Sequence, residues 1–393
     1  MNPSRRPDAP RLASLLRTAL PLALGLPVAA LAQSSLTLYG VIDSALTYQS
    51  HSDNAGHAVT GLEQNGEGFL SGSRFGLRGN EDLGNGLKAG FVLENGFLAD
   101  SGKLDQQGQL FGRQAYVRIG NQWGDLALGR QYTTANTMLY YVDPLGVGAA
   151  PSNSWMVYLT GQRYDNAVSY TGNFGPMSVI AEYALGETAG KGSANSSVSL
   201  GVKYASGWLT AIGDFQQTRD YQSRAARIYM AGLKAAVGRG NLFANYLYSD
   251  RDGGFDSSRG GTDTATITSM STAPTPTNRA AINSVFNGSR RDDFVTIGGN
   301  YAVTRAVTLT ASVMYDHTRA DNFSGNRTTA YGVADYAFSK RTDAYLAVAY
   351  DWVRGDWSGL FGNNTTSWTG DSGRRLDGRD NQTTVMLGLR HVF

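Results

Sequence analysis

The chain has 393 residues and no Cys, and its 34 Lys and Arg against 32 Asp and Glu give a net charge of +2. These values exclude a disulfide scaffold, thiolate metal sites and a Cys nucleophile, and they offer no concentrated basic face for nucleic acid. Only 17% of residues are charged and 41% hydrophobic, which fits neither a packed soluble enzyme nor a helical membrane protein, while 15 Phe, 21 Tyr and 6 Trp argue against disorder.

Residues 1–32 predict a secretory signal peptide that is cleaved off. An apolar run extends from Ala19 to Leu31, and Ala30-Leu31-Ala32 is a small-x-small cleavage site before Gln33. The run is too short to span a membrane, which disfavours an anchor. The positive start that such signals carry is supplied by Arg5, Arg6, Arg11 and Arg17. We therefore expect residues 33–393 to form the folded domain.

The rest of the chain alternates between apolar and polar residues. No stretch after Leu31 is apolar for about 18 residues, which excludes transmembrane helices. A period of two predicts strands with one apolar and one polar face, and many runs match the roughly 9–11 residues of a tilted membrane strand. About sixteen such runs occur, near residues 35–49, 69–81, 86–98, 110–121, 124–131, 164–173, 176–187, 196–205, 207–218, 225–237, 240–250, 293–302, 305–317, 327–338, 341–353 and 382–393.

The connections between these runs are short and long in turn. Tight turns such as Phe174-Gly175 and Ser339-Lys340 alternate with long segments, among them 132–163, 251–292 and 354–381. This rhythm predicts an all-β fold: a transmembrane antiparallel β-barrel of about 16 strands, with short periplasmic turns and long extracellular loops. A soluble β-sandwich also alternates but needs no such rhythm. Aromatic residues near strand ends suit two interfacial girdles: Tyr39, Tyr48, Trp123, Trp155, Trp208, Tyr246, Tyr248, Tyr350 and Trp352.

Four segments resemble the general diffusion porins of Gram-negative bacteria, in particular the sixteen-stranded β-proteobacterial type. They are SLTLYGVID (35–43), SGSRFGLRGNEDLG (71–84) with GLKA (86–89), LFGRQAYV (110–117) followed by LGRQY (128–132), and LGLRHVF (387–393). The resemblance implies a homotrimer in outer-membrane lipid, with a water-filled channel for passive diffusion of small hydrophilic solutes and ions. It also implies that the third loop, residues 132–163, folds into the lumen, and that the terminal Phe393 is read by the outer-membrane assembly machinery.

The resemblance further implies a pore constriction with basic residues on one wall and acids on the inward loop. By motif, Arg74, Arg130 and Arg163 correspond to the basic wall, and Arg78 shares a face with Arg74. Strict alternation puts Arg130 outward, where it would cost about 2–4 kcal/mol in mid-membrane lipid. We therefore expect a bulge at Gly129 that turns Arg130 inward. Arg113 is a lesser candidate, because alternation places it outward as well.

The third loop contains only one acid before Asp165, namely Asp143. Several arginines against one aspartate predict a positive constriction and a mild preference for anions. Lumen-facing Asp43, Glu94 and Glu182 could weaken or reverse this preference. The apolar runs 138–142 and 155–159 favour packing of this loop against the inner wall.

Other functions are less favoured by the sequence. The four His residues form no group poised for acid–base chemistry, so we do not expect an enzyme, and no motif predicts a cofactor. The run 250–253 resembles the start of a calcium loop but lacks its closing Glu, so a solvated loop is favoured over a weak Ca²⁺ site. One alternative is a substrate-specific channel, with Tyr140, Tyr141, Trp155 and Tyr158 as its binding track. A barrel adhesin or receptor would use the loops 251–291 and 354–381, but it needs no inward arginine cluster.

Overall fold

The computed structural model describes residues 35–51, 56–62, 70–148, 161–256, 288–358 and 380–393. The predicted signal peptide lies outside these residues. Within them, the wall is a closed ring of 16 long antiparallel strands, and the four-residue β2 (Val59–Leu62) is an addition to it. The wall strands are β1 (Ser35–Gln49), β3 (Arg74–Gly84), β4 (Leu87–Gly96), β5 (Gln114–Asn121), β6 (Gly124–Tyr132), β7 (Arg163–Phe174), β8 (Met177–Ala184), β9 (Ser197–Ser206), β10 (Leu209–Arg219), β11 (Ala225–Val237), β12 (Gly240–Arg251), β13 (Arg290–Ala302), β14 (Val307–Ala320), β15 (Phe323–Ala337), β16 (Thr342–Gly355) and β17 (Asn381–Val392).

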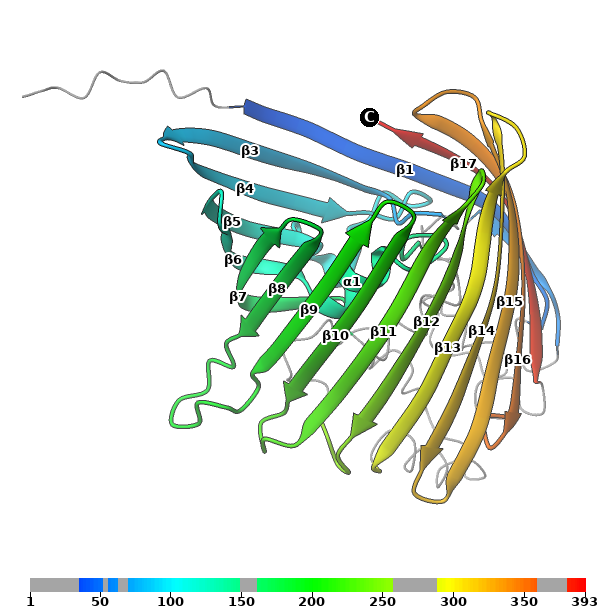
Figure 1. Ribbon diagram of the computed structural model, residues 1–393. Helices are drawn as coiled ribbons and strands as arrows, with labels where there is room; N and C mark the ends of the chain where they lie inside the picture. Colours follow the sequence, from blue (N-terminus) through cyan, green and yellow to red (C-terminus); the bar gives the residue numbers. More distant parts are fainter. Residues whose placement is uncertain (1–34, 52–55, 63–69, 149–160, 257–287, 359–379) are drawn as a thin grey trace, which may run out of the picture.

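The barrel closes where the first strand meets the last (Figure 1). One edge of β1 pairs with β17 over Val41–Gln49, and the other edge pairs with β3 over Ser35–Val41 and then with β2. Apart from these pairings of β1, each wall strand pairs with the wall strands that precede and follow it in sequence. The all-β barrel predicted from the alternation is therefore confirmed. Two strands, β1 and β11, have the predicted bounds, whereas β5 begins at Gln114 rather than near residue 110.

The outer face of the wall is apolar at mid-height. Cross-strand partners point to the same side of a sheet, and the register places Leu233, Ala244, Ile297, Val313 and Ala330 in one outward row over β11–β15. Ile297 is 63% exposed and Val313 is 50% exposed. Aromatic pairs lie toward the two rims, such as Tyr229–Tyr248 on the loop side and Tyr336–Phe338 near a tight turn. This is the surface of a barrel that faces lipid.

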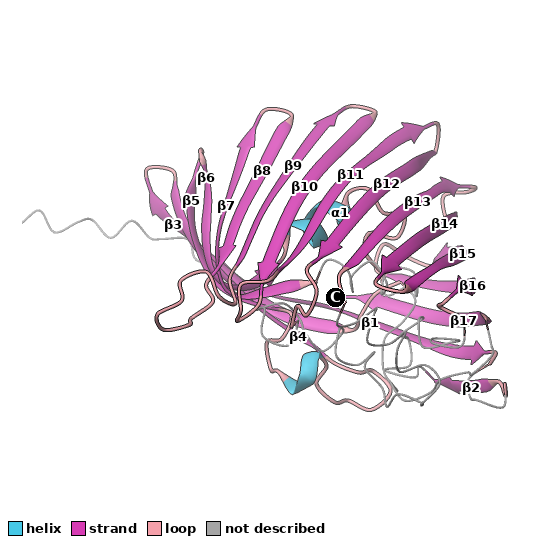
Figure 2. Cartoon of the chain, turned by 90° about the horizontal axis from the view of Figure 1, so that it is seen from below, coloured by secondary structure: helices cyan, strands magenta, loops and turns pink. Residues whose placement is uncertain are grey.

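The described part of the third loop lies inside the barrel, as predicted, and contains a short helix that the sequence did not predict. Helix α1 (Thr134–Tyr140) is capped by Thr133, whose side chain accepts a hydrogen bond from the Asn136 N–H. The helix packs against β8, β9 and β10, and Figure 2 shows the wall strands curving around it.

Glycines on the inner wall make room for this loop. A Cβ atom on Gly201, Gly232 or Gly298 would come within 2.8, 2.6 or 2.7 Å of Met138, Val142 or Pro144 respectively. These glycines lie on β9, β11 and β13, so the loop follows the inner wall across these strands. A 3₁₀ turn, η1 (Gln106–Gly108), precedes β5. No helix in the described part of the chain is long and apolar enough to span a membrane.

Candidate functional site

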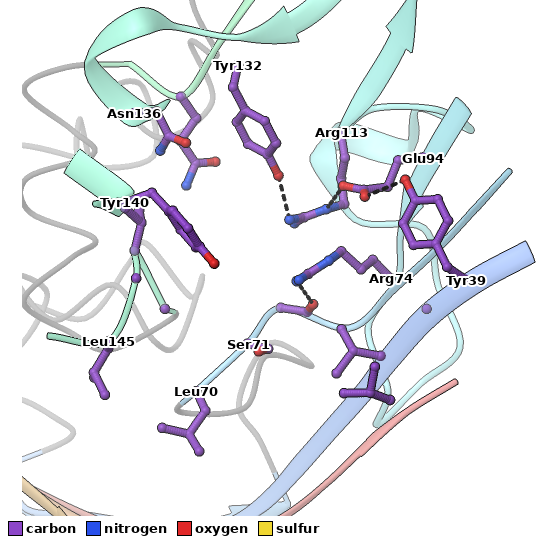
Figure 3. A pocket seen from close by; sticks show the side chains of 18 of the residues that line it. Tyr39, Leu70, Ser71, Arg74, Glu94, Arg113, Tyr132, Asn136, Tyr140 and Leu145 are labelled. Atoms are coloured by element: carbon purple, nitrogen blue, oxygen red, sulfur yellow. Dashed lines mark hydrogen bonds and ion pairs between the residues drawn. The ribbon is translucent and has the colours of Figure 1, made fainter. Parts of the chain in front are cut away.

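A cavity of about 670 Å³ lies in the lumen between the third loop and strands β1, β3 and β4 (Figure 3). Four arginines line it. Arg74 and Arg163 are the first residues of β3 and β7, Arg113 directly precedes β5, and Arg390 lies on β17. Of the predicted constriction residues, the structure brings Arg74 and Arg163 together here, whereas Arg78, Arg130 and Asp143 do not line the cavity.

Arg74 has no carboxylate partner among the described residues. Its Nη1 donates to the carbonyl of Gly72 at 2.9 Å, a neutral acceptor two residues earlier in its own chain. A guanidinium has five N–H donors and stays charged, so Arg74 adds positive charge to the cavity, where the nearby carboxylate of Glu94 is bound directly by Arg113 and not by Arg74.

Arg113 belongs to a compact hydrogen-bonded group of four side chains. Its Nε donates to Glu94 Oε1 at 2.8 Å, its Nη2 donates to the Tyr132 hydroxyl at 2.7 Å, and the Tyr39 hydroxyl donates to Glu94 Oε2 at 2.9 Å. The Arg163 guanidinium lies over the Tyr132 ring, 4.8 Å from its centroid. Glu94 therefore lines the cavity with its charge matched by Arg113.

Two members of this group, Arg113 and Tyr39, lie on the lumen side, against the predictions from the sequence. Arg113 can point inward because it lies just before β5, which begins at Gln114, so the alternation of that strand does not extend to it. Gly112, immediately before Arg113, is the residue in the sequence that could have indicated where the apolar–polar alternation of the strand begins. Tyr39 belongs to the lumen and not to an outer aromatic girdle, since its hydroxyl reaches Glu94.

Arg78 and Arg130 lie away from the cavity for different reasons. Arg78 is an exposed residue four positions along β3 from Arg74, with the Tyr39 ring 5.4 Å from its guanidinium carbon. The predicted irregularity beside Gly129 is present as a register shift between β6 and β7. Gly129 pairs with Ala167 and Gln131 pairs with Tyr164, so β6 advances by two residues where β7 advances by three. The extra residue therefore lies on β7, and the alternation of β6 is unbroken. Arg130 pairs with Ala115 and binds the Gly112 carbonyl and Asp165, and the expected inward turn is not seen.

Asp143 shapes the loop and does not face the arginines. Its Oδ2 accepts hydrogen bonds from the backbone N–H groups of Leu145, at 3.0 Å, and Val147, at 2.9 Å, and the residue is buried. The loop therefore presents Tyr140, Leu145 and Val147 to the cavity, with no carboxylate among its described lining residues. Trp155 and Tyr158 lie outside the described residues.

Asp43 holds the segment that precedes Arg74. Its Oδ2 accepts hydrogen bonds from the N–H groups of Leu70, at 3.1 Å, and Ser71, at 2.7 Å, and its Oδ1 accepts from the Tyr345 hydroxyl at 2.7 Å. The N–H of Asp43 also donates to Ser73 Oγ. This buried carboxylate thus ties the chain before Arg74 to β1 and β16. Asp43 and the buried Glu182 face inward but do not line the cavity.

Several other inward arginines have carboxylate partners. Arg290 pairs with Asp292 and Arg327 with Asp351, each at 2.7 Å, and Arg390, which borders the cavity, pairs with Asp343 at 3.0 Å. In the run 250–253, which resembles the start of a calcium loop, Asp250 and Asp252 both bind Arg227. The described residues contain no group of three or more acids or histidines placed to hold a metal ion.

Comparisons with known proteins identify relatives. The Gram-negative porin family model matches residues 18–356. The chain is 39% identical over 161 residues to an outer membrane porin protein of Bordetella pertussis, covering 37% of this chain and 41% of that protein. It is 34% identical over 233 residues to outer membrane porin protein 32 of Delftia acidovorans, covering 57% and 59%. The matched parts thus span about half the length of these curated relatives.

Solved structures share the fold. The anion-selective porin from Comamonas acidovorans superimposes with a TM-score of 0.67 at 22% identity, covering 92% of this chain and all of that one. The trimer form of OmpT from Vibrio cholerae gives a TM-score of 0.61 at 16% identity, covering 92% and 99%. Because the family model matches most of its length, the chain belongs to the Gram-negative porin family.

Proposed function

We propose that the protein is an outer-membrane channel for the passive diffusion of small hydrophilic solutes and ions, with a mild preference for anions. The observation that carries the proposal is Arg74, which faces the lumen without a carboxylate partner among the described residues, in a cavity that Arg113 and Arg163 also line. Family membership and the closed barrel support the channel, and the arginines support the sign of its selectivity.

The selectivity follows from charge balance at the cavity. Among the described residues that line the cavity, Glu94 is the only one with a side-chain carboxylate, and its two oxygens accept hydrogen bonds from Arg113 and Tyr39. An anion that enters therefore meets net positive charge on the strand side and no repulsion from a loop carboxylate, whereas a cation is repelled. Clusters of side-chain charge in a narrow aqueous pore set ion selectivity in this way.

We include in the proposal the homotrimer, the surrounding outer-membrane lipid and recognition of the C-terminus by the outer-membrane assembly machinery. Phe393 forms two backbone hydrogen bonds with Gly40, each at 3.1 Å, at the junction of the first and last strands. A terminal residue at this junction is available until the barrel closes, which suits an assembly signal. The trimer is supported by the solved neighbour named as a trimer form.

Planar-bilayer recording of the refolded mature chain in a KCl gradient tests the proposal. We expect conductance that appears in steps of three, with a reversal potential on the anion-selective side. A cation-selective reversal potential would overturn the charge assignment while keeping the channel. The absence of conductance from a correctly folded barrel would instead favour an adhesin or receptor.

A further inference from the structure

The loop side of the cavity differs chemically from the arginine side. Tyr140 is 61% exposed although it lies inside the lumen, and Figure 3 shows its ring directed toward the space in front of Arg74. Leu145 and Val147 also line the cavity from the loop. The strand side thus offers guanidinium N–H donors, and the loop side offers an aromatic ring and aliphatic groups beside the polar side chains of Asn136, Thr137 and Gln162.

This apolar wall is built and held in place. Val147 adopts a φ of 55°, a conformation that is sterically unfavourable for a β-branched residue. The hydrogen bonds from Leu145 and Val147 to Asp143 maintain it. The Tyr140 ring packs edge-on against Tyr141, with centroids 5.7 Å apart. Strained backbone persists where the surroundings enforce it, and such positions cluster at binding sites.

We propose that this cavity is a binding site for organic anions that carry an apolar body, such as aromatic carboxylates. The carboxylate would bind Arg74, and the apolar body would lie against Tyr140 and Leu145. The inference rests on the proposed function and specifies the solute class of the same channel. A cavity of about 670 Å³ is within the range of small-molecule sites.

The two walls favour such a solute over an inorganic anion. Chloride or acetate gains attraction from the arginines alone, whereas an aromatic carboxylate also removes apolar surface from water against the loop. Binding at both ends gives a saturable step in an otherwise diffusive channel. The protein would then combine general diffusion with a substrate-specific binding site in the same pore.

Conductance in potassium benzoate and in potassium acetate, measured against concentration, tests this proposal because the two anions share a charge and differ in their apolar body. In the unmodified protein we expect benzoate to half-saturate the conductance at a concentration about fivefold to tenfold lower than acetate. Tyr140→Ser and Leu145→Ser should each bring the two concentrations closer together. Tyr140→Phe, which keeps the ring, should preserve the difference.

The matched control is Tyr221→Ser, a change to an exposed tyrosine between β10 and β11, outside the cavity. It should leave the benzoate-to-acetate ratio unchanged. Equal half-saturation by the two anions in the unmodified protein would overturn the proposal, yet an anion-selective reversal potential in KCl would leave the proposed function standing. Folded Tyr140→Ser and Leu145→Ser variants that both keep the full difference would also overturn it.

Discussion

Two regions of the lumen carry inward arginines, and they differ in how those charges are matched. On β13–β16, Arg290 and Arg327 each form an ion pair with a buried aspartate. At the cavity, Arg74 donates to a backbone carbonyl and has no carboxylate partner among the described residues. The number of arginines in a pore therefore says little about its field, because a matched guanidinium contributes little net charge. An arginine at the cavity that forms no such ion pair contributes its charge where ions must pass.

The largest expected effect comes from breaking a matched pair. Arg327 and Asp351 have side chains only 2% and 3% exposed, so Asp351→Asn leaves a buried guanidinium without its counter-charge. We expect the free energy of unfolding to fall by about 3–5 kcal/mol. Denaturant titration in lipid vesicles measures it. The double variant Arg327→Met with Asp351→Leu removes both charges and should recover most of the loss, and no recovery would refute the pairing argument.

Asp43→Asn tests how Arg74 is positioned. The substitution weakens the hydrogen bonds from Leu70 and Ser71 and should cost about 1–3 kcal/mol of stability. Removing a negative charge would by itself raise the anion preference of the channel. Because Asp43 holds the segment that precedes Arg74, we expect the anion preference to fall instead. A rise in the bilayer reversal measurement would show that Asp43 acts through its charge and not through positioning.

The loop wall can be moved without changing any charge. A Cβ on Gly232 would meet Val142 at 2.6 Å, so Gly232→Leu should push the third loop toward the cavity. We expect a smaller single-channel conductance and a stability loss of about 1–3 kcal/mol from overpacking. Gly213→Leu is the matched control, since no atom lies within 4 Å of the Cβ position there. Equal conductance in the two variants would argue against the loop forming the cavity wall.

The smallest expected effect is local and depends on pH. Asp220, in the loop after β10, accepts hydrogen bonds from the N–H groups of Gln222, Arg224 and Asp256 and from the Arg224 side chain. Burial would raise the pKa of Asp220, but the hydrogen bonds from Asp256 and Arg224 outweigh it and hold the pKa below its usual value.

A lowered pKa in the folded state means that this carboxylate stabilises the loop above the unfolded pKa of about 4, and that the contribution is lost as the pH falls through the folded value. Hydrogen exchange of the Arg224 amide, corrected for its intrinsic rate, should show protection at pH 7 that declines below about pH 4. Asp220→Asn should lack most of this protection at pH 7. Protection independent of pH in the unmodified protein would contradict the assignment.

The strands could be predicted from the sequence because alternation is enforced by lipid on one side and water on the other. The runs at 35–49 and 225–237 coincide with β1 and β11. Helix α1 was missed because its seven residues are stabilised by contacts with a distant wall, which no local period records.

The site was predictable only in part. The motif resemblance pointed to Arg74 and Arg163, and the structure places both among the residues that line the cavity. The inward direction of Arg113 was not predicted because alternation gives the side of a residue only within a strand. Arg113 lies one residue before β5, and the sequence pattern did not locate the start of that strand. The orientation of Asp143 was also hidden, because its two backbone partners lie within the loop that it shapes. Whether an arginine forms an ion pair depends on contacts between segments that are far apart in the sequence, so no local pattern records it.

The reversal potential in a KCl gradient, compared between Arg74→Gln and Arg78→Gln, tests the central claim most directly. Both variants remove one positive charge from the same strand and the same inward face, but only Arg74 lines the cavity. We predict that Arg74→Gln shifts the reversal potential strongly toward cation selectivity and that Arg78→Gln shifts it little. Equal shifts in the two variants would contradict the claim, because selectivity would then follow the total charge of the lumen and not the arginine that lines the cavity.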